Sequence, residues 1–180
     1  MFQVSTTRPF PDLMAEAMQR MVEQMAKAPA ESSGKLDADF VGQMIPHHQG
    51  AIDMTRAVAL YARKGDRAIR NLITTILTTQ PDEIRRMEAI NPSRLLTPPQ
   101  YTKNADRIEE KMISYMNVDF ATPVQLFVEM MIPHHKAGIA MAKNYLMFGK
   151  NPRLKNLAQG IIVEQEHEIR LMHLWKQNHI

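Results

Sequence analysis

Apolar side chains recur every three or four positions along most of the chain, which is the period of an amphipathic α-helix. Proline, glycine and asparagine interrupt this pattern at five places. The intervals between the interruptions predict helices over about 11–28, 37–63, 66–89, 99–116, 122–148 and 152–178. No stretch alternates polar and apolar residues for long enough to predict a strand. The four long segments form two pairs, each joined by a tight turn and preceded by a shorter segment, so the pattern predicts an all-α four-helix bundle with two additional shorter helices.

The hydrophobic pattern occurs twice in the chain. Residues 44–54 read MIPHHQGAIDM and residues 131–141 read MIPHHKAGIAM, at an offset of 87 positions. Further on, QPDEIRRM at 80–87 matches QEHEIRLM at 165–172 after a contraction of two residues. We therefore interpret the chain as a tandem duplication. The expected division is a methionine-rich N-terminal helix and hinge over 1–36 and a bundle over 37–180, with repeat 1 at about 37–90, a linker helix at about 99–116 and repeat 2 at about 122–178.

Polar residues interrupt the apolar stripes at matching positions of the two repeats. One long helix of each repeat carries two adjacent histidines, and the returning helix carries glutamine and glutamate at consecutive stripe positions. The polar set comprises His47, His48, Gln80, Glu83, His134, His135, Gln165 and Glu168. Counting from the turns at about 1.5 Å per residue places each histidine pair opposite a glutamate. A pseudo-twofold along the bundle axis would then bring both pairs into one layer.

Methionines flank this predicted layer. The chain has 15 methionines, 7 histidines and no cysteine, so thioethers are its only sulfur ligands. Imidazole and thioether donors without thiolate favour monovalent copper and, by softness, silver. The candidate ligands are His47, His48, His134, His135, Met44, Met54, Met131 and Met141. Residues expected to support them, with the glutamates fixing the imidazole tautomers, are Gln80, Glu83, Gln165, Glu168, Met87 and Met172.

The polar layer also has two other interpretations. Buried polar groups that satisfy one another can simply fix the register of packed helices, which would make the protein a helical interaction module. A ferritin-like di-iron oxidase is the other alternative, but it requires two Glu-x-x-His motifs and two further glutamates. The chain offers that motif once, at Glu164 and His167, which is too few hard ligands.

A proline precedes each histidine pair, at Pro46 and Pro133. Inside a helix, proline cannot donate to the carbonyl four residues earlier, so each could kink its helix and turn the imidazoles toward the axis. Alternatively, each proline marks the first turn of a helix that follows a short preceding one. The sequence does not distinguish the two.

Outside the repeated motifs, methionines and histidines give two further candidates. The N-terminal helix carries a stripe at spacings of four, three and four residues, formed by Met14, Met18, Met21 and Met25. This stripe either docks the helix on the bundle or offers exchangeable thioethers that collect or pass on soft ions, and both roles are compatible. On the last helix, His173 and His179 are candidates for a weak surface site for divalent copper, although surface histidines often have no such role.

Composition excludes several other classes of protein. The net charge is +3 and the basic residues are spread among 19 acidic ones, so no basic face of the kind that binds nucleic acid is expected. The absence of cysteine excludes thiolate catalysis. No apolar run approaches the roughly 20 residues that span a bilayer, so we expect a soluble chain without membrane insertion. The expected partners are metal ions, with a copper sensor kinase or an efflux component as candidate protein partners.

The repeated motif resembles the signature MIPHHxxAIxM of a family of small ferritin-like bacterial proteins grouped as a domain of unknown function, and the resemblance extends from Asp39 to Trp175. It implies a bundle located in the periplasm or outside the cell, with looser divalent copper sites on its surface and a first helix whose movement is connected with transfer. It places a monovalent copper or silver site on His47, His48, His134 and His135. We therefore expect a copper metallochaperone or sequestration protein that contributes to copper homeostasis and resistance, and not an enzyme. The second motif departs from the signature at Gly138, which is expected to loosen that half.

Overall fold

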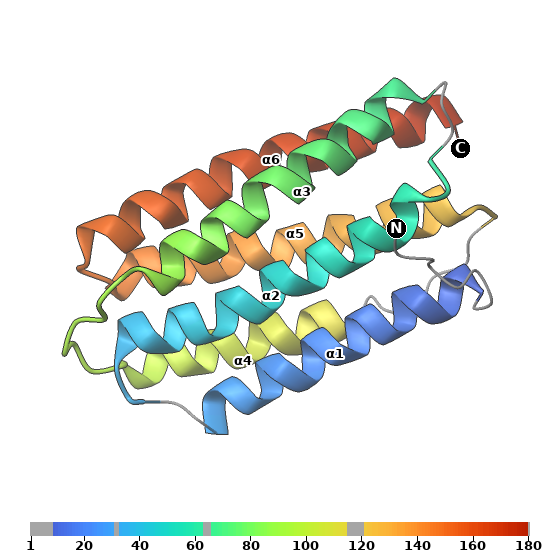
Figure 1. Ribbon diagram of the computed structural model, residues 1–180. Coiled ribbons are helices and arrows are strands. Elements are labelled where there is room, and N and C mark those ends of the chain that lie inside the picture. Colours follow the sequence, from blue (N-terminus) through green and yellow to red (C-terminus); the bar gives the residue numbers. More distant parts are fainter. Residues whose placement is uncertain (1–8, 31–32, 63–65, 115–120, 180) are drawn as a thin grey trace.

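The computed structural model describes residues 9–30, 33–62, 66–114 and 121–179, and it leaves the side chains of residues 25–30 undescribed. Six helices follow one another: α1 (Phe10–Ala30), α2 (Leu36–Ala59), α3 (Arg67–Glu88), α4 (Pro99–Ile113), α5 (Pro123–Phe148) and α6 (Pro152–His179) (Figure 1). Within these described ranges there is no strand, and an isolated bridge joins Lys35 to Leu96. The prediction of an all-α fold is confirmed, and the helix boundaries lie within four residues of those expected.

The helices are arranged in three layers of two (Figure 1). The middle layer consists of α2 and α5, which α3 and α6 cover on one side and α1 and α4 on the other. Because both sides of the middle layer are covered, α2 and α5 are buried on most of their surface, whereas the outer helices bury a single stripe. The four-helix bundle of the sequence prediction is therefore α2, α3, α5 and α6. None of the helices in the described part of the chain is long and apolar enough to cross a membrane.

The middle helices α2 and α5 run antiparallel. Near the start of α2, Asp37 accepts a hydrogen bond from Tyr145 Oη near the end of α5, at 2.7 Å. In the same way, Asp66 before α3 accepts one from Trp175 Nε1 near the end of α6, at 2.6 Å. The pseudo-twofold that relates the repeats therefore crosses the helices, and the axis along the bundle that the sequence analysis considered is wrong. Because both histidine pairs lie near the midpoints of their helices, the two pairs still meet.

A buried carboxylate, Asp37, ties the loop after α3 to the bundle. Besides Tyr145, it accepts hydrogen bonds from the Ser93 backbone N–H at 2.8 Å and from Asn151 Nδ2 at 3.3 Å. Burial alone would raise the pKa of Asp37, but these hydrogen bonds outweigh burial and lower it below the ordinary value of 3.8. The ionised form of Asp37 thus stabilises the fold.

We expect the Asp37→Asn variant to lose about 1.5–3 kcal/mol of unfolding free energy at neutral pH, because hydrogen bonds to a charged acceptor are replaced by weaker ones. A carboxyl whose folded pKa is lowered stabilises the protein above its unfolded pKa, and that contribution is lost as the pH falls through the folded value. The difference between wild type and variant should therefore shrink below a pH of about 4. Urea unfolding at neutral and acidic pH measures it, with the exposed Asp12→Asn as control. A difference that persists undiminished in acid would contradict this account.

Candidate metal centre

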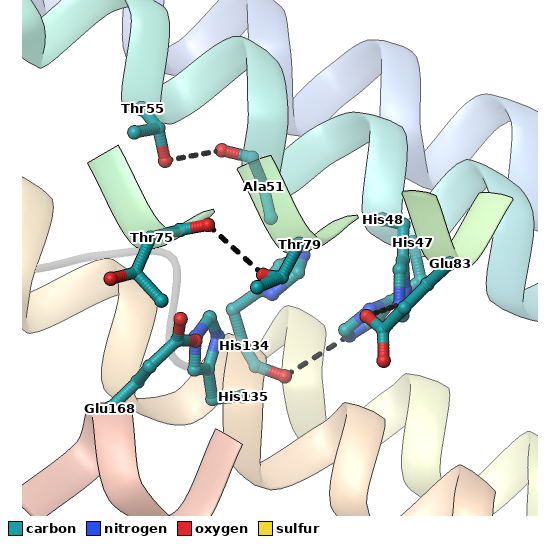
Figure 2. A network of polar contacts seen from close by, with 10 residues as sticks. All are labelled: His47, His48, Ala51, Thr55, Thr75, Thr79, Glu83, His134, His135 and Glu168. Carbon is teal, nitrogen blue, oxygen red and sulfur yellow. Dashed lines mark hydrogen bonds and ion pairs between the residues drawn. The ribbon is translucent and has the colours of Figure 1, made fainter. Parts of the chain in front are cut away.

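The polar residues of the core stripes form one buried layer at the middle of the bundle. Its imidazoles come from α2 and α5, and its carboxylates come from α3 and α6 (Figure 2). Each of these residues is at most 5% exposed, and they are His47, His48, Gln80, Glu83, His134, His135, Gln165 and Glu168. The prediction that both histidine pairs meet in one layer is confirmed.

One histidine of each pair is hydrogen-bonded to a glutamate. His48 Nε2 lies 2.9 Å from Glu83 Oε2, and His135 Nε2 lies 2.6 Å from Glu168 Oε2. Because a carboxylate only accepts, each ring donates from Nε2, and in the neutral ring the lone pair is then on Nδ1. The glutamates thus occupy the places predicted for groups that fix the imidazole tautomers.

The other two histidines lie against each other at the centre. The ring centroids of His47 and His134 are 3.8 Å apart, with 30° between the ring planes. His47 Nε2 donates to the His134 carbonyl oxygen at 3.1 Å, which leaves its lone pair on Nδ1. His134 Nε2 lies 3.1 Å from the sulfur of Met21, a weak acceptor contributed by α1. Both central rings therefore contact the opposite repeat or the covering helix.

Gly138 allows the central ring to approach α5. A Cβ atom at this position would lie 2.9 Å from His47 Cε1 and 2.5 Å from Gln165 Oε1. The space that a larger residue would need is therefore filled by two members of the polar layer. The expectation that Gly138 loosens this half of the protein is wrong, because the glycine is what permits close packing here.

The layer contains polar atoms that the protein does not satisfy. The atoms without a hydrogen-bond partner on the protein are Nδ1 of His47, His48, His134 and His135, both amide atoms of Gln80 and Gln165, and Oε1 of Glu168. Among the described residues, no buried side-chain nitrogen or oxygen outside this layer lacks a partner. A buried unpaired polar atom costs about 1–3 kcal/mol, so a layer serving only to set register would be expected to close its own hydrogen bonds.

The central imidazoles are held in their neutral form. Burial lowers the pKa of both His47 and His134 well below the ordinary value of 6.5, and the neighbouring imidazoles lower it further. Neutral imidazole is the form that binds metals. A further acidic residue, Glu164, lies beside the layer. Its partial burial raises its pKa, and the negative charges of Glu83 and Glu168 raise it further.

The predicted methionines are all buried, but the thioether placed against an imidazole belongs to another helix. The six methionines expected around the layer are at most 4% exposed, and they are Met44, Met54, Met87, Met131, Met141 and Met172. The sulfur in contact with His134 is that of Met21, from the stripe on α1. Met14 and Met18 are buried on the same helix, whereas the side chain of Met25 is outside the described residues.

Gly50 on α2 leaves room for the side chain of Met21, and this glycine is visible in the sequence. A Cβ atom at Gly50 would lie 2.6–2.8 Å from the Sδ, Cγ and Cβ atoms of Met21. The corresponding residue of the second repeat, 87 positions later, is Ala137. Only the first repeat therefore has a glycine here, and its covering helix reaches the imidazoles through that gap.

The remaining candidate histidines have separate surroundings. His179 stacks on Trp175 with ring centroids 4.7 Å apart and hydrogen-bonds the Trp175 carbonyl through Nδ1 at 2.8 Å. His173 is exposed and lines a pocket between α4, α5 and α6. His167 is also exposed, so the Glu-x-x-His motif of the oxidase alternative does not direct its imidazole into the bundle.

Pro46 and Pro133 both lie inside continuous helices, α2 and α5. The alternative that each proline marks a first helical turn is therefore wrong. Because proline has no N–H, the carbonyls of Gly42 and Glu129 lack the helical donor that another residue would supply. The backbone is thus weakened one turn before each histidine pair.

The donor set fits a soft ion of low coordination number. No group of three or more histidine, aspartate, glutamate or cysteine side chains is arranged to hold a metal within the described ranges. Structural zinc sites usually use four such ligands, and calcium uses six to eight oxygens. Imidazole nitrogens with buried thioethers nearby match the preference of monovalent copper instead.

Similar structures have been solved for several proteins. CopM in its Cu(I)-bound form is 28% identical over 79% of this chain and 96% of its own, with a TM-score of 0.59. CopM in its Ag-bound form is 26% identical over the same shares, with a TM-score of 0.58. A DUF305 fragment from Deinococcus radiodurans is 26% identical over 77% of this chain and 93% of its own, with a TM-score of 0.53.

Sequence comparisons agree with the structural ones. The uncharacterized protein L153 of Acanthamoeba polyphaga mimivirus is 48% identical over 42 residues, 23% of this chain. That match spans only 28% of the length of L153. The profile of DUF305, a domain of unknown function, matches residues 4–91 and 102–176. Since this match covers most of the sequence, the protein belongs to the DUF305 family.

Proposed function

We propose that the protein binds monovalent copper, and silver as its analogue, through imidazole Nδ1 atoms and methionine sulfur in the middle of the bundle. The observation that carries the proposal is the set of four buried Nδ1 atoms without a partner on the protein. Their rings are oriented by Nε2 contacts to carboxylates, a carbonyl and a thioether, so each lone pair is directed away from those partners. A bound cation would satisfy atoms that otherwise destabilise the fold.

The family relationship supports the choice of metal. CopM is known in Cu(I)-bound and Ag-bound forms, and its likeness to this chain extends over 79% of the sequence. The chemistry of the layer is consistent with the same ions, because it offers imidazoles and thioethers and no cysteine thiolate. Met21 orients the ring of His134, since its sulfur is 3.1 Å from Nε2. The candidate sulfur ligands are the buried Met44, Met54, Met131 and Met141.

The physiological role we propose is sequestration or delivery of copper, contributing to copper homeostasis and resistance outside the cytoplasm. Neighbouring methionines one turn apart on a helix have Cβ atoms about 5–6 Å apart, so Met18 and Met14 continue from Met21 as a row of exchangeable ligands. The two-part division of the chain at residue 36, a divalent copper site at the surface, and a sensor kinase or efflux component as recipient stay predictions.

The alternative of a helical interaction module is not favoured. Such a module would use the polar layer to set helix register. The unpaired amide atoms of Gln80 and Gln165 would then lower the stability of the module, and no bound group would offset that loss. In the metal-binding proposal these amides are available to accommodate an ion and its ligands.

Competition with a chromophoric Cu(I) chelator under anaerobic conditions tests the proposal. We expect the protein to withdraw Cu(I) from the chelator, and we expect ¹⁵N NMR of labelled histidines to show Nδ1 signals shifting when Ag(I) is added. Saturation with ligand should also raise the thermal unfolding midpoint. If the chelator kept all its copper at high protein concentration, the interaction-module alternative would replace this function.

A further inference from the structure

A second site lies outside the polar layer, over α5 and between α4 and α6. There the surface encloses a pocket of about 450 Å³. Its floor is apolar and includes Ile108 and Met112 of α4 and Ile132 and Ala137 of α5. A volume of this size is within the range that holds small organic ligands.

The rim of this pocket is basic. Lys111, Lys136, Lys176 and His173 line it, against a single acidic residue, Glu129. Glu129 is already neutralised by Lys176, whose Nζ lies 2.5 Å from Glu129 Oε1. Lys111 and Lys136 are exposed and form no ion pair with any described residue. The pocket therefore offers two ammonium groups that pair with no carboxylate in the described part of the chain, above an apolar floor.

The duplication supplies an internal comparison. At the corresponding positions of the first repeat, the residues matching Lys111 and Lys136 are Gln24 and Gln49, at an offset of 87. Those matching His173 and Lys176 are Glu88 and Asn91, at an offset of 85. The first repeat thus has no cation at any of the four matching positions, so the basic rim is particular to the second repeat.

The floor differs between the repeats as well. In the first repeat, Met21 packs directly onto Gly50. In the second repeat, the matching residues are Ile108 and Ala137, both of which line the pocket. A shorter, branched side chain on α4 and a methyl group on α5 replace the long methionine side chain, which leaves space between the helices.

We infer that this pocket binds a small organic carboxylate with an apolar body. The carboxylate would be held by Lys111 and Lys136, and the apolar part would cover the side chains of Ile108 and Ile132. Charge complementarity selects an anion, and the apolar floor selects against a small hydrophilic one such as acetate. This inference does not depend on metal binding in the bundle.

Decanoate below its micellar concentration is the probe that tests the inference. We expect saturable shifts of the methyl NMR signals of Ile108, Ile132 and Ala137 in the full-length protein. Decanol, which lacks the charge, and acetate, which lacks the apolar body, should each bind more weakly than decanoate. Equal binding of decanol, or shifts confined to other methyl groups, would overturn the inference.

Variants that convert the second repeat toward the first sharpen the test. The double variant Lys111→Gln and Lys136→Gln should weaken decanoate binding about tenfold, because it removes both ammonium groups that hold the carboxylate while leaving the apolar floor intact. The matched double variant Lys103→Gln and Lys143→Gln removes the same charge from α4 and α5 outside the pocket and should bind as wild type does. Equal weakening by both double variants would show only a general effect of net charge and would refute the site.

Discussion

Replacing His47 and His134 together by phenylalanine is expected to lower the affinity for Cu(I) by more than about 100-fold. Residues that only support metal ligands change affinity by roughly 10–100-fold, so removing two of the four buried Nδ1 donors should exceed that range. Phenylalanine keeps a planar ring at each position of this tilted pair, whose centroids are 3.8 Å apart, so the apo protein should remain folded. The chelator competition experiment measures the loss directly.

The control for this variant uses imidazoles outside the bundle. His167→Phe and His173→Phe change exposed rings and should leave the Cu(I) affinity of the core unchanged. Circular dichroism and unfolding of the apo proteins establish that each variant is folded. Unchanged affinity in the folded His47→Phe, His134→Phe protein would disprove the assignment of the central rings as ligands, whatever else binds copper on the surface.

The Gly50→Ala variant is expected to destabilise the protein by about 1–3 kcal/mol, although alanine is the better helix former. The added methyl group would lie 2.8 Å from the Cβ of Met21, so the overlap involves more than the flexible end of that side chain and α1 has to shift. Chemical denaturation measures the stability. The ¹³C-methyl signal of Met21 reports whether its sulfur leaves His134.

Gly42→Ala is the matched control on the same helix. A Cβ at Gly42 meets nothing within 4 Å, so the substitution should stabilise the helix by up to about 1 kcal/mol. The two variants are therefore expected to change the free energy of unfolding in opposite directions. Equal stabilisation by both would mean that Met21 does not pack as described, and its role in orienting the ring of His134 would fail with it.

Helix positions and the polar layer were predictable because both depend on local periodicity. An α-helix repeats every 3.6 residues whatever its neighbours, so the sequence alone places His47 and Glu83 on buried stripes. The short connection after α2 then limits their relative heights, and the hydrogen bond between His48 and Glu83 follows at 2.9 Å. Duplication carries the same reasoning to His135 and Glu168.

Contacts between elements that no tight turn joins were not predictable in this way. From the sequence, the meeting of the two histidine pairs was made conditional on a twofold along the bundle. The contact of Asp37 with Tyr145 shows that the repeats are instead related by an axis across it. Met21 was assigned to a docking or transfer stripe, and only the packing of α1 onto Gly50 brings its sulfur to His134.

The sequence by itself thus determined the helices, their buried faces, the duplication and the residue types of the candidate site. Tertiary structure alone decided which imidazoles lie against each other, which thioether contacts them and which repeat contains a pocket with a basic rim. The physical reason is that a periodic pattern specifies the face a helix buries, whereas the partner of that face depends on how whole layers dock. In this protein, Gly50 and Gly138 leave space that side chains from other helices occupy, the Met21 side chain at the first and the His47 and Gln165 side chains at the second.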